Sequence, residues 1–137
     1  VSEPYAFRKV RAHLDKRIVV VLAAGTGVTG VSTDTAAINR AINLQATTVY
    51  KGTKVMGVFD SDPKKNPAAK HLRRVTYRDF LKQRLQILDE EAILAAAKEK
   101  LPIHVFDIFQ EGNLSRILSG EDLGSCIHHE ELAENRV

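Results

Sequence analysis

The chain has 137 residues, of which 44% are hydrophobic and 27% are charged, which suits one folded domain and argues against a disordered chain. A net charge of +3 is too small for a basic nucleic-acid-binding arm, so no specific nucleic-acid partner is expected. The single cysteine, Cys126, excludes a disulfide within the chain, and no apolar run is long enough to span a membrane.

The first third of the chain predicts a helix, a strand and a second helix. Residues 4–16 place apolar side chains on one helical face, and residues 17–24 form a β-branched apolar run typical of a buried parallel strand. A glycine-rich loop follows, and then a helix for which Thr33 or Asp34 is the expected N-cap. A strand at residues 47–52 would complete a βαβ unit with a right-handed crossover.

The rest of the chain predicts a long loop and then alternating helices and strands. Residues 53–74 contain two prolines and a basic run, so they are expected to be mostly loop. The expected elements that follow are a helix from a capping Thr76 to about Arg84, a helix at 89–100, a strand at 103–109, a helix from a capping Asn113 to Ser119 and a strand at 124–128. This order predicts an α/β fold, a three-layer α/β/α sandwich with a mainly parallel sheet.

Residues 23–37, AAGTGVTGVSTDTAA, are the first candidate ligand-binding segment. Glycines at 25, 27 and 30 would let backbone N–H groups approach a phosphate, and the following helix points its positive end at the same place. The spacing matches neither the Walker A sequence nor the dinucleotide-binding fingerprint. Anion binding and a plain strand-to-helix turn therefore both remain open.

Residues 51–67 are the second candidate segment. Lys51, Lys54, Lys64 and Lys65 surround two aspartates, and these residue types suit phosphate, ribose or Mg²⁺ contacts. Composition alone favours a solvated surface loop instead. Asp89 starts a helix, where N-capping is the common role, and none of the five histidines has the spacing of a metal site, so no metal ligands are expected.

Taken in order, the segments AAGTG, TDTAA, KGTKVMGVFDSDPKKNPAAK, LPIHVF and GEDLG resemble the uridylate (UMP) kinases of the amino-acid kinase family, of bacterial or plastid type. The resemblance covers roughly residues 3 to 127, and the DPKKNP run is its most specific element. It implies that residues 1–128 form the C-terminal ATP-binding lobe of that fold and that residues 129–137 form a tail.

The resemblance also implies a set of binding residues, with ATP and Mg²⁺ as cofactors and UMP as acceptor. Catalytic roles fall to Asp34 and Asp89, and ATP contacts fall to Thr53, Lys54, Phe59 and Asp62. The implied UMP-binding residues are Thr26, Gly27, Val28, Thr29, Gly30, Val31, Ser32 and Thr33. The family usually has Asn-Pro-Phe-Phe where this chain has Val28–Val31, which removes an amide, a rigid turn and two aromatic side chains.

The implied activity is transfer of a phosphoryl group from ATP to UMP, a step of pyrimidine biosynthesis. The Lys-rich first strand and the Gly-Gly-Gly-Asn segment of the family's N-terminal half are not in this sequence, so the chain alone is expected to be inactive. The expected partner is a chain supplying that half or a homo-oligomer, hexameric by resemblance, in the cytoplasm or alternatively in the plastid stroma.

Two other functions remain open from the sequence. The altered acceptor loop permits a degenerate kinase fold that serves as a structural or regulatory subunit. It also permits a relative whose acceptor is a carbamate or an amino acid, which the DPKKNP run disfavours.

Overall fold

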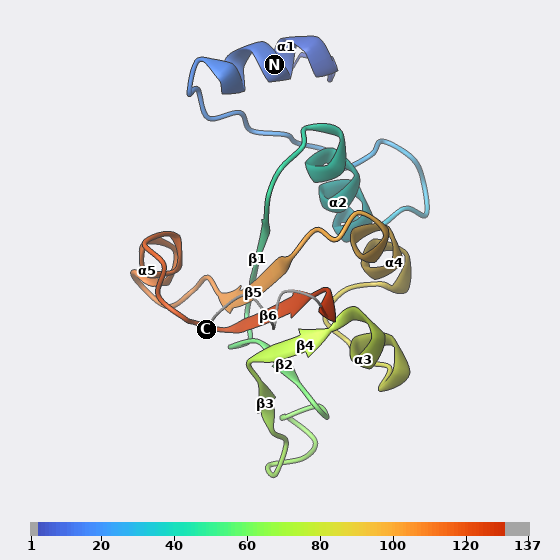
Figure 1. The fold of residues 1–137 in the computed structure, drawn as a ribbon, viewed down its shortest axis with the longest axis vertical. Coiled ribbons are helices and arrows are strands. Elements are labelled where there is room, and N and C mark those ends of the chain that lie inside the picture. Colours follow the sequence, from blue (N-terminus) through green and yellow to red (C-terminus); the bar gives the residue numbers. More distant parts are fainter. Residues whose placement is uncertain (1–2, 131–137) are drawn as a thin grey trace.

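The structure is a computed structural model that describes residues 3–130, and its centre is a four-stranded sheet (Figure 1). In spatial order the strands are β1 (Val49–Thr53), β5 (Ile103–Asp107), β6 (Ser125–His128) and β4 (Arg74–Thr76). The β1–β5 and β4–β6 pairs are parallel, whereas β5 and β6 are antiparallel. The sheet is therefore mixed and mostly parallel.

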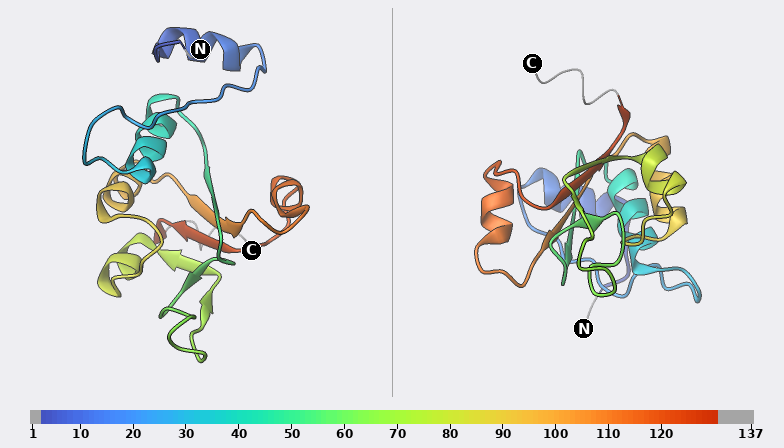
Figure 2. Two further views of the ribbon diagram at one scale, coloured as in Figure 1. Left: turned by 180° about the vertical axis from the view of Figure 1, so that it is seen from behind. Right: turned by 90° about the horizontal axis from the view of Figure 1, so that it is seen from below.

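Helices cover both faces of this sheet, which makes the three layers that the sequence predicts (Figure 2). One face carries α2 (Thr33–Asn43), α3 (Tyr77–Lys82) and α4 (Glu90–Lys98), and the other carries α5 (Asn113–Leu118). The first helix, α1 (Phe7–Asp15), lies beyond α2 at the far end of the molecule. Within the described residues no helix combines the length and apolar character needed to cross a membrane. The α/β sandwich prediction is confirmed.

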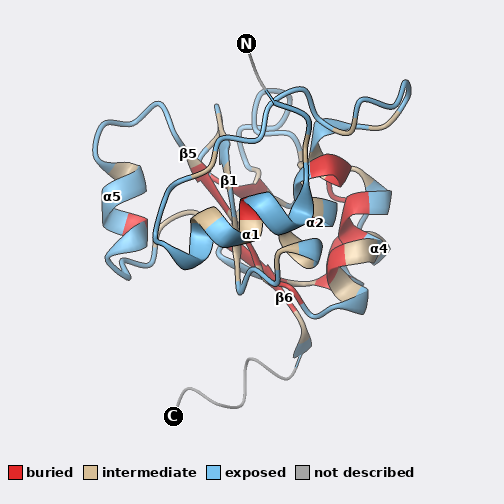
Figure 3. Cartoon of the chain, turned by 90° about the horizontal axis from the view of Figure 1, so that it is seen from above, coloured by how far each residue is buried: buried red, intermediate tan, exposed pale blue. Residues whose placement is uncertain are grey.

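The hydrophobic core lies between the sheet and the α2–α3–α4 layer (Figure 3). Ile103, Val105 and Ile127 on the strands are fully buried, as are Ile38 of α2 and Ile93 of α4. The small side chains of α4 allow α2 to pack closely against it. Burial of these side chains, each worth about 1.5–3 kcal/mol, fixes the helix N-termini relative to the ends of the strands.

The predicted strand at residues 17–24 is wrong. Residues 18–24 have no strand hydrogen bonds, and Val19 and Val21 are 88% and 86% exposed. The prediction rested on side-chain propensity, but a strand forms only where a neighbouring strand supplies hydrogen-bond partners. Among residues 3–130, β5 is the only strand that pairs with β1, so the expected βαβ unit does not form.

The predicted long loop at residues 53–74 contains strands that the sequence did not reveal. A two-stranded antiparallel sheet joins β2 (Val58–Phe59) to β3 (His71–Leu72), and β4 follows at once. Strands of two or three residues are too short to show an alternating pattern. The residues between β2 and β3, 60–70, are irregular and correspond to the expected loop.

The helix caps agree with the sequence only in part. Thr76 caps α3 through a bond from the Asp79 amide, 3.1 Å long, as predicted. The N-cap of α2 is Ser32 rather than Thr33 or Asp34, and the N-cap of α5 is Gly112 rather than Asn113. Asn113 instead donates its side-chain amide to the Asp107 carbonyl, 3.0 Å away. Residues 131–137 of the expected tail lie outside the described residues.

Candidate functional site

Asp89 joins the N-termini of α2 and α4. It caps α4 by accepting the Ala92 amide at 2.9 Å, and its carboxylate also accepts the hydroxyl of Thr35, at 3.0 Å, and that of Ser32. Burial raises the pKa of this carboxyl, but the hydrogen bonds outweigh burial and the pKa is lowered overall. Asp89 is thus an ionised link between the two helices.

Asp34 lies in the first turn of α2 and pairs with Lys51 of β1. The two side chains form an ion pair and are each about a quarter exposed, at 25% and 22%. The pair ties the start of α2 to the strand beside it. It also leaves the Lys51 ammonium partly accessible, so this charge is available to a phosphate only in competition with Asp34.

The glycine-rich loop before α2 is open to solvent. Gly25, Gly27 and Gly30 all have positive φ, and a Cβ added at Gly27 or Gly30 would meet nothing within 4 Å. The loop is held locally, since the Val28 amide donates to the Thr26 hydroxyl at 3.1 Å. The glycines make the turn, and their exposed backbone leaves room for an anion, so the structure is compatible with both interpretations of this loop.

Part of the loop borders a large open groove of about 1500 Å³. The groove runs between α1, the irregular segment 18–24 and α2, and continues to Tyr50 on β1. Among the expected UMP-binding residues, Thr26, Gly27 and Thr33 line it. Its walls are mainly apolar away from this loop.

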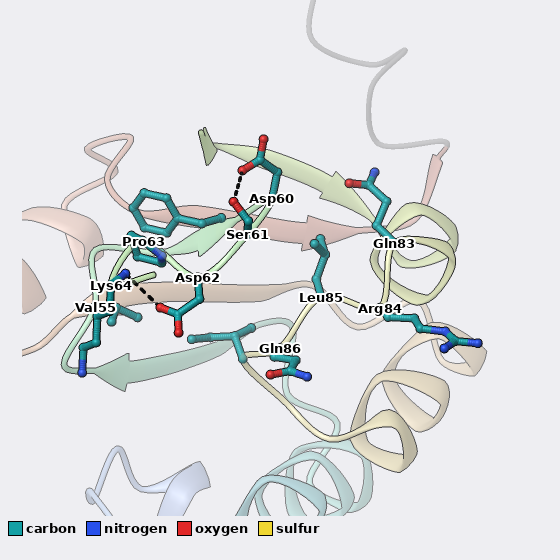
Figure 4. Close-up of a pocket in the computed structure, with 13 residues that line it drawn as sticks. Val55, Asp60, Ser61, Asp62, Pro63, Lys64, Gln83, Arg84, Leu85 and Gln86 are labelled. Atoms are coloured by element: carbon teal, nitrogen blue, oxygen red, sulfur yellow. Dashed lines mark hydrogen bonds between the residues drawn. The ribbon is translucent and has the colours of Figure 1, made fainter. Parts of the chain in front are cut away.

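A second, smaller pocket of about 410 Å³ lies between the residue 60–64 loop and the connection from α3 to α4 (Figure 4). Of the expected ATP contacts, Phe59 and Asp62 line it. Its remaining walls come from these two segments and from the turn before β2, and are Val55, Gly57, Asp60, Ser61, Pro63, Lys64, Gln83, Arg84, Leu85, Gln86 and Ile87. The pocket thus combines an aromatic ring, carboxylates and positive charges.

The aspartates of this pocket hold the loop on which they lie. Asp62 accepts the Lys64 amide at 2.9 Å, and Asp60 accepts the Lys70 amide at 2.8 Å and the Ser61 hydroxyl at 3.1 Å. Figure 4 draws the Ser61–Asp60 and Lys64–Asp62 bonds as dashed lines. Each therefore uses one oxygen to fix the turn, and Asp62 is exposed, so its other oxygen can accept from a ligand hydroxyl.

Thr53 and Lys54 lie beside the pocket rather than on its wall. The Thr53 hydroxyl donates to the Val55 carbonyl at 2.8 Å and accepts the Val55 amide at 3.1 Å, which closes the turn after β1. Lys54 is exposed. Thr53 therefore shapes the turn that presents Val55 to the pocket.

Residues 83–87 are pocket residues that the sequence did not identify. The connection follows α3 closely, and Arg84 at its start has a left-handed backbone with φ of +51°. Its alternation of polar and apolar side chains is visible in the sequence, but that pattern does not say which distant loop it will face. Only the packing of α3 against β4 brings the connection opposite residues 60–64.

Comparison with known proteins supports one family. The model of the amino acid kinase family matches residues 2–107. The uridylate kinase of Rickettsia typhi is 45% identical over 121 residues, and that of Rickettsia felis is 46% identical over 118. These matches cover 88% and 86% of this chain but only 50% and 49% of the relatives. The chain thus spans about half the length of the curated relatives it matches.

Solved structures agree with this result. UMP kinase from Bacillus anthracis superposes with a TM-score of 0.90 at 36% identity, covering 94% of this chain and 53% of that one. UMP kinase from Ureaplasma parvum gives a TM-score of 0.84 at 26% identity, covering 90% and 53%. The backbone similarity therefore extends over most of the chain.

Proposed function

The chain belongs to the amino acid kinase family, and from this premise we propose that it is the C-terminal, nucleotide-binding half of a uridylate kinase. Completed by the N-terminal half, the protein transfers the γ-phosphoryl group of ATP to a phosphate oxygen of UMP, giving ADP and UDP. The observation that carries the proposal is the 410 Å³ pocket, which places Phe59 and Asp62 together on a fold shared with UMP kinases.

The pocket has the size and chemistry of a nucleotide site. Small-molecule pockets commonly measure about 300–1,000 Å³ and combine apolar walls with a few polar groups. Phe59 offers a face for the adenine or ribose, and Asp62 offers an acceptor for a ribose hydroxyl. Lys64 lies on the same wall and Lys54 lies nearby in the chain, so positive charge is available for the phosphates.

The acceptor is proposed to bind at the glycine-rich loop. Residues 26–33 expose backbone and hydroxyl donors, and the N-terminus of α2 adds its positive dipole. Lys51, held by Asp34, supplies a positive charge near the start of the same helix. Asp89 holds the α2 and α4 termini together and thereby organises this side of the reaction centre.

Magnesium ion fits this arrangement as a partner of the nucleotide. Among residues 3–130 no three His, Cys, Asp or Glu side chains gather as a ready-made metal site. Mg²⁺ in kinases is held mostly by phosphates and one or two carboxylates. Lys51 already pairs with Asp34 and two hydroxyls already occupy Asp89, so the nucleotide phosphates would supply most of the ligands of the ion. Bound there, the ion would neutralise phosphate charge.

Phosphoryl transfer is proposed to require the other half of the protein. The transition state is stabilised by positioned positive charge around the transferring group. The exposed run at residues 18–24 and the open edge of β1 suit a strand supplied by that half. Association into a homo-oligomer and a cytoplasmic location, in keeping with the Rickettsia relatives, belong to the same proposal.

Two observations favour the alternative of a structural or regulatory subunit. Both carboxylates assigned to the reaction centre are engaged within the chain, Asp34 by Lys51 and Asp89 by two hydroxyls. The loop at residues 28–31 also carries valine, threonine and glycine where the family has an amide and aromatic rings. A protein of this kind would bind ATP without phosphorylating UMP.

The test combines binding and turnover. Calorimetry with the chain should detect MgATP binding. Asp62→Asn should lower the affinity for MgATP about tenfold, because a hydrogen bond to a charged group is worth about 1.5–3 kcal/mol. Asp79→Asn is the matched control, since Asp79 is an exposed aspartate on α3 outside the pocket lining. A polypeptide supplying the N-terminal half should then restore UDP formation.

Each negative result has a separate meaning. MgATP binding without UDP formation in the completed protein favours the subunit alternative. Absence of both MgATP binding and UDP formation overturns the kinase proposal.

A further inference from the structure

A buried polar junction connects the four-stranded sheet to the two-stranded β2–β3 sheet. Ser125, the first residue of β6, is only 1% exposed. Its hydroxyl oxygen accepts the Val58 amide at 2.8 Å and lies 3.0 Å from Nε2 of His71. One side chain from β6 therefore contacts both β2 and β3.

The hydrogen-bond directions at this junction follow from its donors. The Val58 N–H can only donate, so the Ser125 oxygen accepts it. A hydroxyl oxygen can accept a second bond, so Nε2–H of His71 could also donate to it, but the buried hydroxyl proton would then have no acceptor among residues 3–130. The hydroxyl therefore donates to Nε2, which is unprotonated, and the neutral ring carries its proton on Nδ1. Burial, with a smaller contribution from the Arg73 charge, lowers the pKa of His71 and favours the neutral ring at neutral pH.

The junction lies directly behind a wall of the 410 Å³ pocket. Gly57 lines the pocket, and a Cβ added there would overlap both the Ser125 hydroxyl oxygen and Nε2 of His71. Only a residue without a side chain allows the chain to pass over the pair. The pocket wall and the junction are thus separated by a single glycine backbone.

His71 also contacts the aromatic ring of the pocket. Phe59 and His71 are register partners across β2 and β3, and their ring centroids lie 5.3 Å apart at an interplanar angle of 44°. This separation is within the range of favourable aromatic contacts. Rotation of the His71 ring would change the surface on which Phe59 rests.

We propose that His71 is a positioning residue that sets the Phe59 wall of the nucleotide pocket, and that Ser125 fixes His71 through its hydroxyl. His71 does not line the pocket, so it acts through Phe59. The identity of the ligand rests on the proposed kinase function, whereas the positioning of Phe59 does not.

Two measurements on the 137-residue chain test the positioning without ligand. Nitrogen-15 spectra of the histidine side chains should show His71 as the neutral Nδ1–H tautomer. The ring-proton chemical shifts of Phe59 should change in His71→Leu and in Ser125→Ala, and they should stay unchanged in His13→Leu. His13 is the matched control because it lies on α1, outside the lining of the 410 Å³ pocket, and its ring bonds locally to the Lys9 carbonyl at 2.7 Å.

Calorimetry then links the junction to the pocket. His71→Leu should lower the affinity for MgATP about fivefold to tenfold. His71→Gln should recover part of this loss, because the glutamine amide oxygen can accept the hydrogen bond from the Ser125 hydroxyl. Unchanged MgATP affinity in His71→Leu overturns the proposal, as does an Nε2–H tautomer in the parent chain.

Failure of the kinase function gives a different pattern. If the parent chain does not bind MgATP, the ligand assignment falls and the Phe59 ring-proton shifts of Ser125→Ala decide, because this variant keeps the His71 ring and removes only the hydroxyl that fixes it. Changed Phe59 shifts in Ser125→Ala support the positioning, and unchanged shifts overturn it. Thermal unfolding of each variant shows which changes accompany general loss of structure, and Ser125→Cys, which replaces the hydroxyl by a weakly hydrogen-bonding thiol, is used if Ser125→Ala does not fold.

Discussion

Replacing Asp89 by alanine removes both the cap of α4 and the link to α2. An N-cap is worth about 1 kcal/mol. The Thr35 and Ser32 hydroxyls each donate to the same charged carboxylate, and in this partly exposed position we expect about 0.5–1 kcal/mol from each. Asp89→Ala should therefore lower the free energy of unfolding by about 2–3 kcal/mol, a large share of the 5–15 kcal/mol typical of a domain.

Two further variants separate these contributions. Asp89→Ser keeps a capping oxygen for the Ala92 amide but is too short to reach α2, so it should lose about 1–2 kcal/mol. Thr76→Ala removes a cap that has no interhelical link and should cost about 1 kcal/mol. Urea unfolding followed by circular dichroism measures all three. The reasoning is refuted if Asp89→Ala costs no more than Thr76→Ala.

The same carboxylate predicts a pH dependence. Hydrogen bonds keep the pKa of Asp89 below that of the unfolded chain, about 3.9, despite the opposing effect of burial. The resulting stabilisation is fully present above about pH 4 and is lost as the pH falls through the lower, folded pKa. The stability gap between the parent and Asp89→Ala should narrow in that acid range, and a gap that is constant from about pH 6 to pH 2 would contradict it.

Two other substitutions test how the sheet is built. Gly124→Ala should lower the free energy of unfolding by about 2 kcal/mol or more, because φ at this position is +72° and the added Cβ would overlap the Val105 carbonyl oxygen. If the variant is as stable as the parent, β5 and β6 separate easily. Tyr77→Phe should cost about 1 kcal/mol in urea unfolding, because the buried hydroxyl donates to the Leu101 carbonyl, and a neutral effect would show that water replaces this bond.

The helices could be predicted because their signals are local. The repeating apolar positions of α2 and α4 and the Thr76 cap all lie within a few residues of the element they define. The cap of α2 was misplaced because Ser32, Thr33 and Asp34 are neighbouring residues that can all cap a helix. Helix α5 begins at Gly112 without a side-chain cap, and the Asn113 side chain bonds the Asp107 carbonyl instead.

The strands and the pocket depended on distant contacts and were predicted less well. Residues 17–24 have strand propensity but no adjacent strand in the described residues, whereas the two-residue strands β2 and β3 form because each is the other's partner. Phe59 and Asp62 were identified through resemblance and do line a pocket. Gln83 to Ile87 were missed because nothing near them in sequence indicates that they face the 60–64 loop.

The exposed run Ile18–Leu22 has a consequence for handling the chain. Five consecutive apolar residues, four of them β-branched, carry no charge and no proline, which is the composition of segments that stack into intermolecular β-sheets. Arg17 before the run and Gly25 after it are the kind of flanking residues that interrupt such stacking. Whether the isolated chain stays dispersed at high concentration therefore depends on this short stretch more than on the well-packed core.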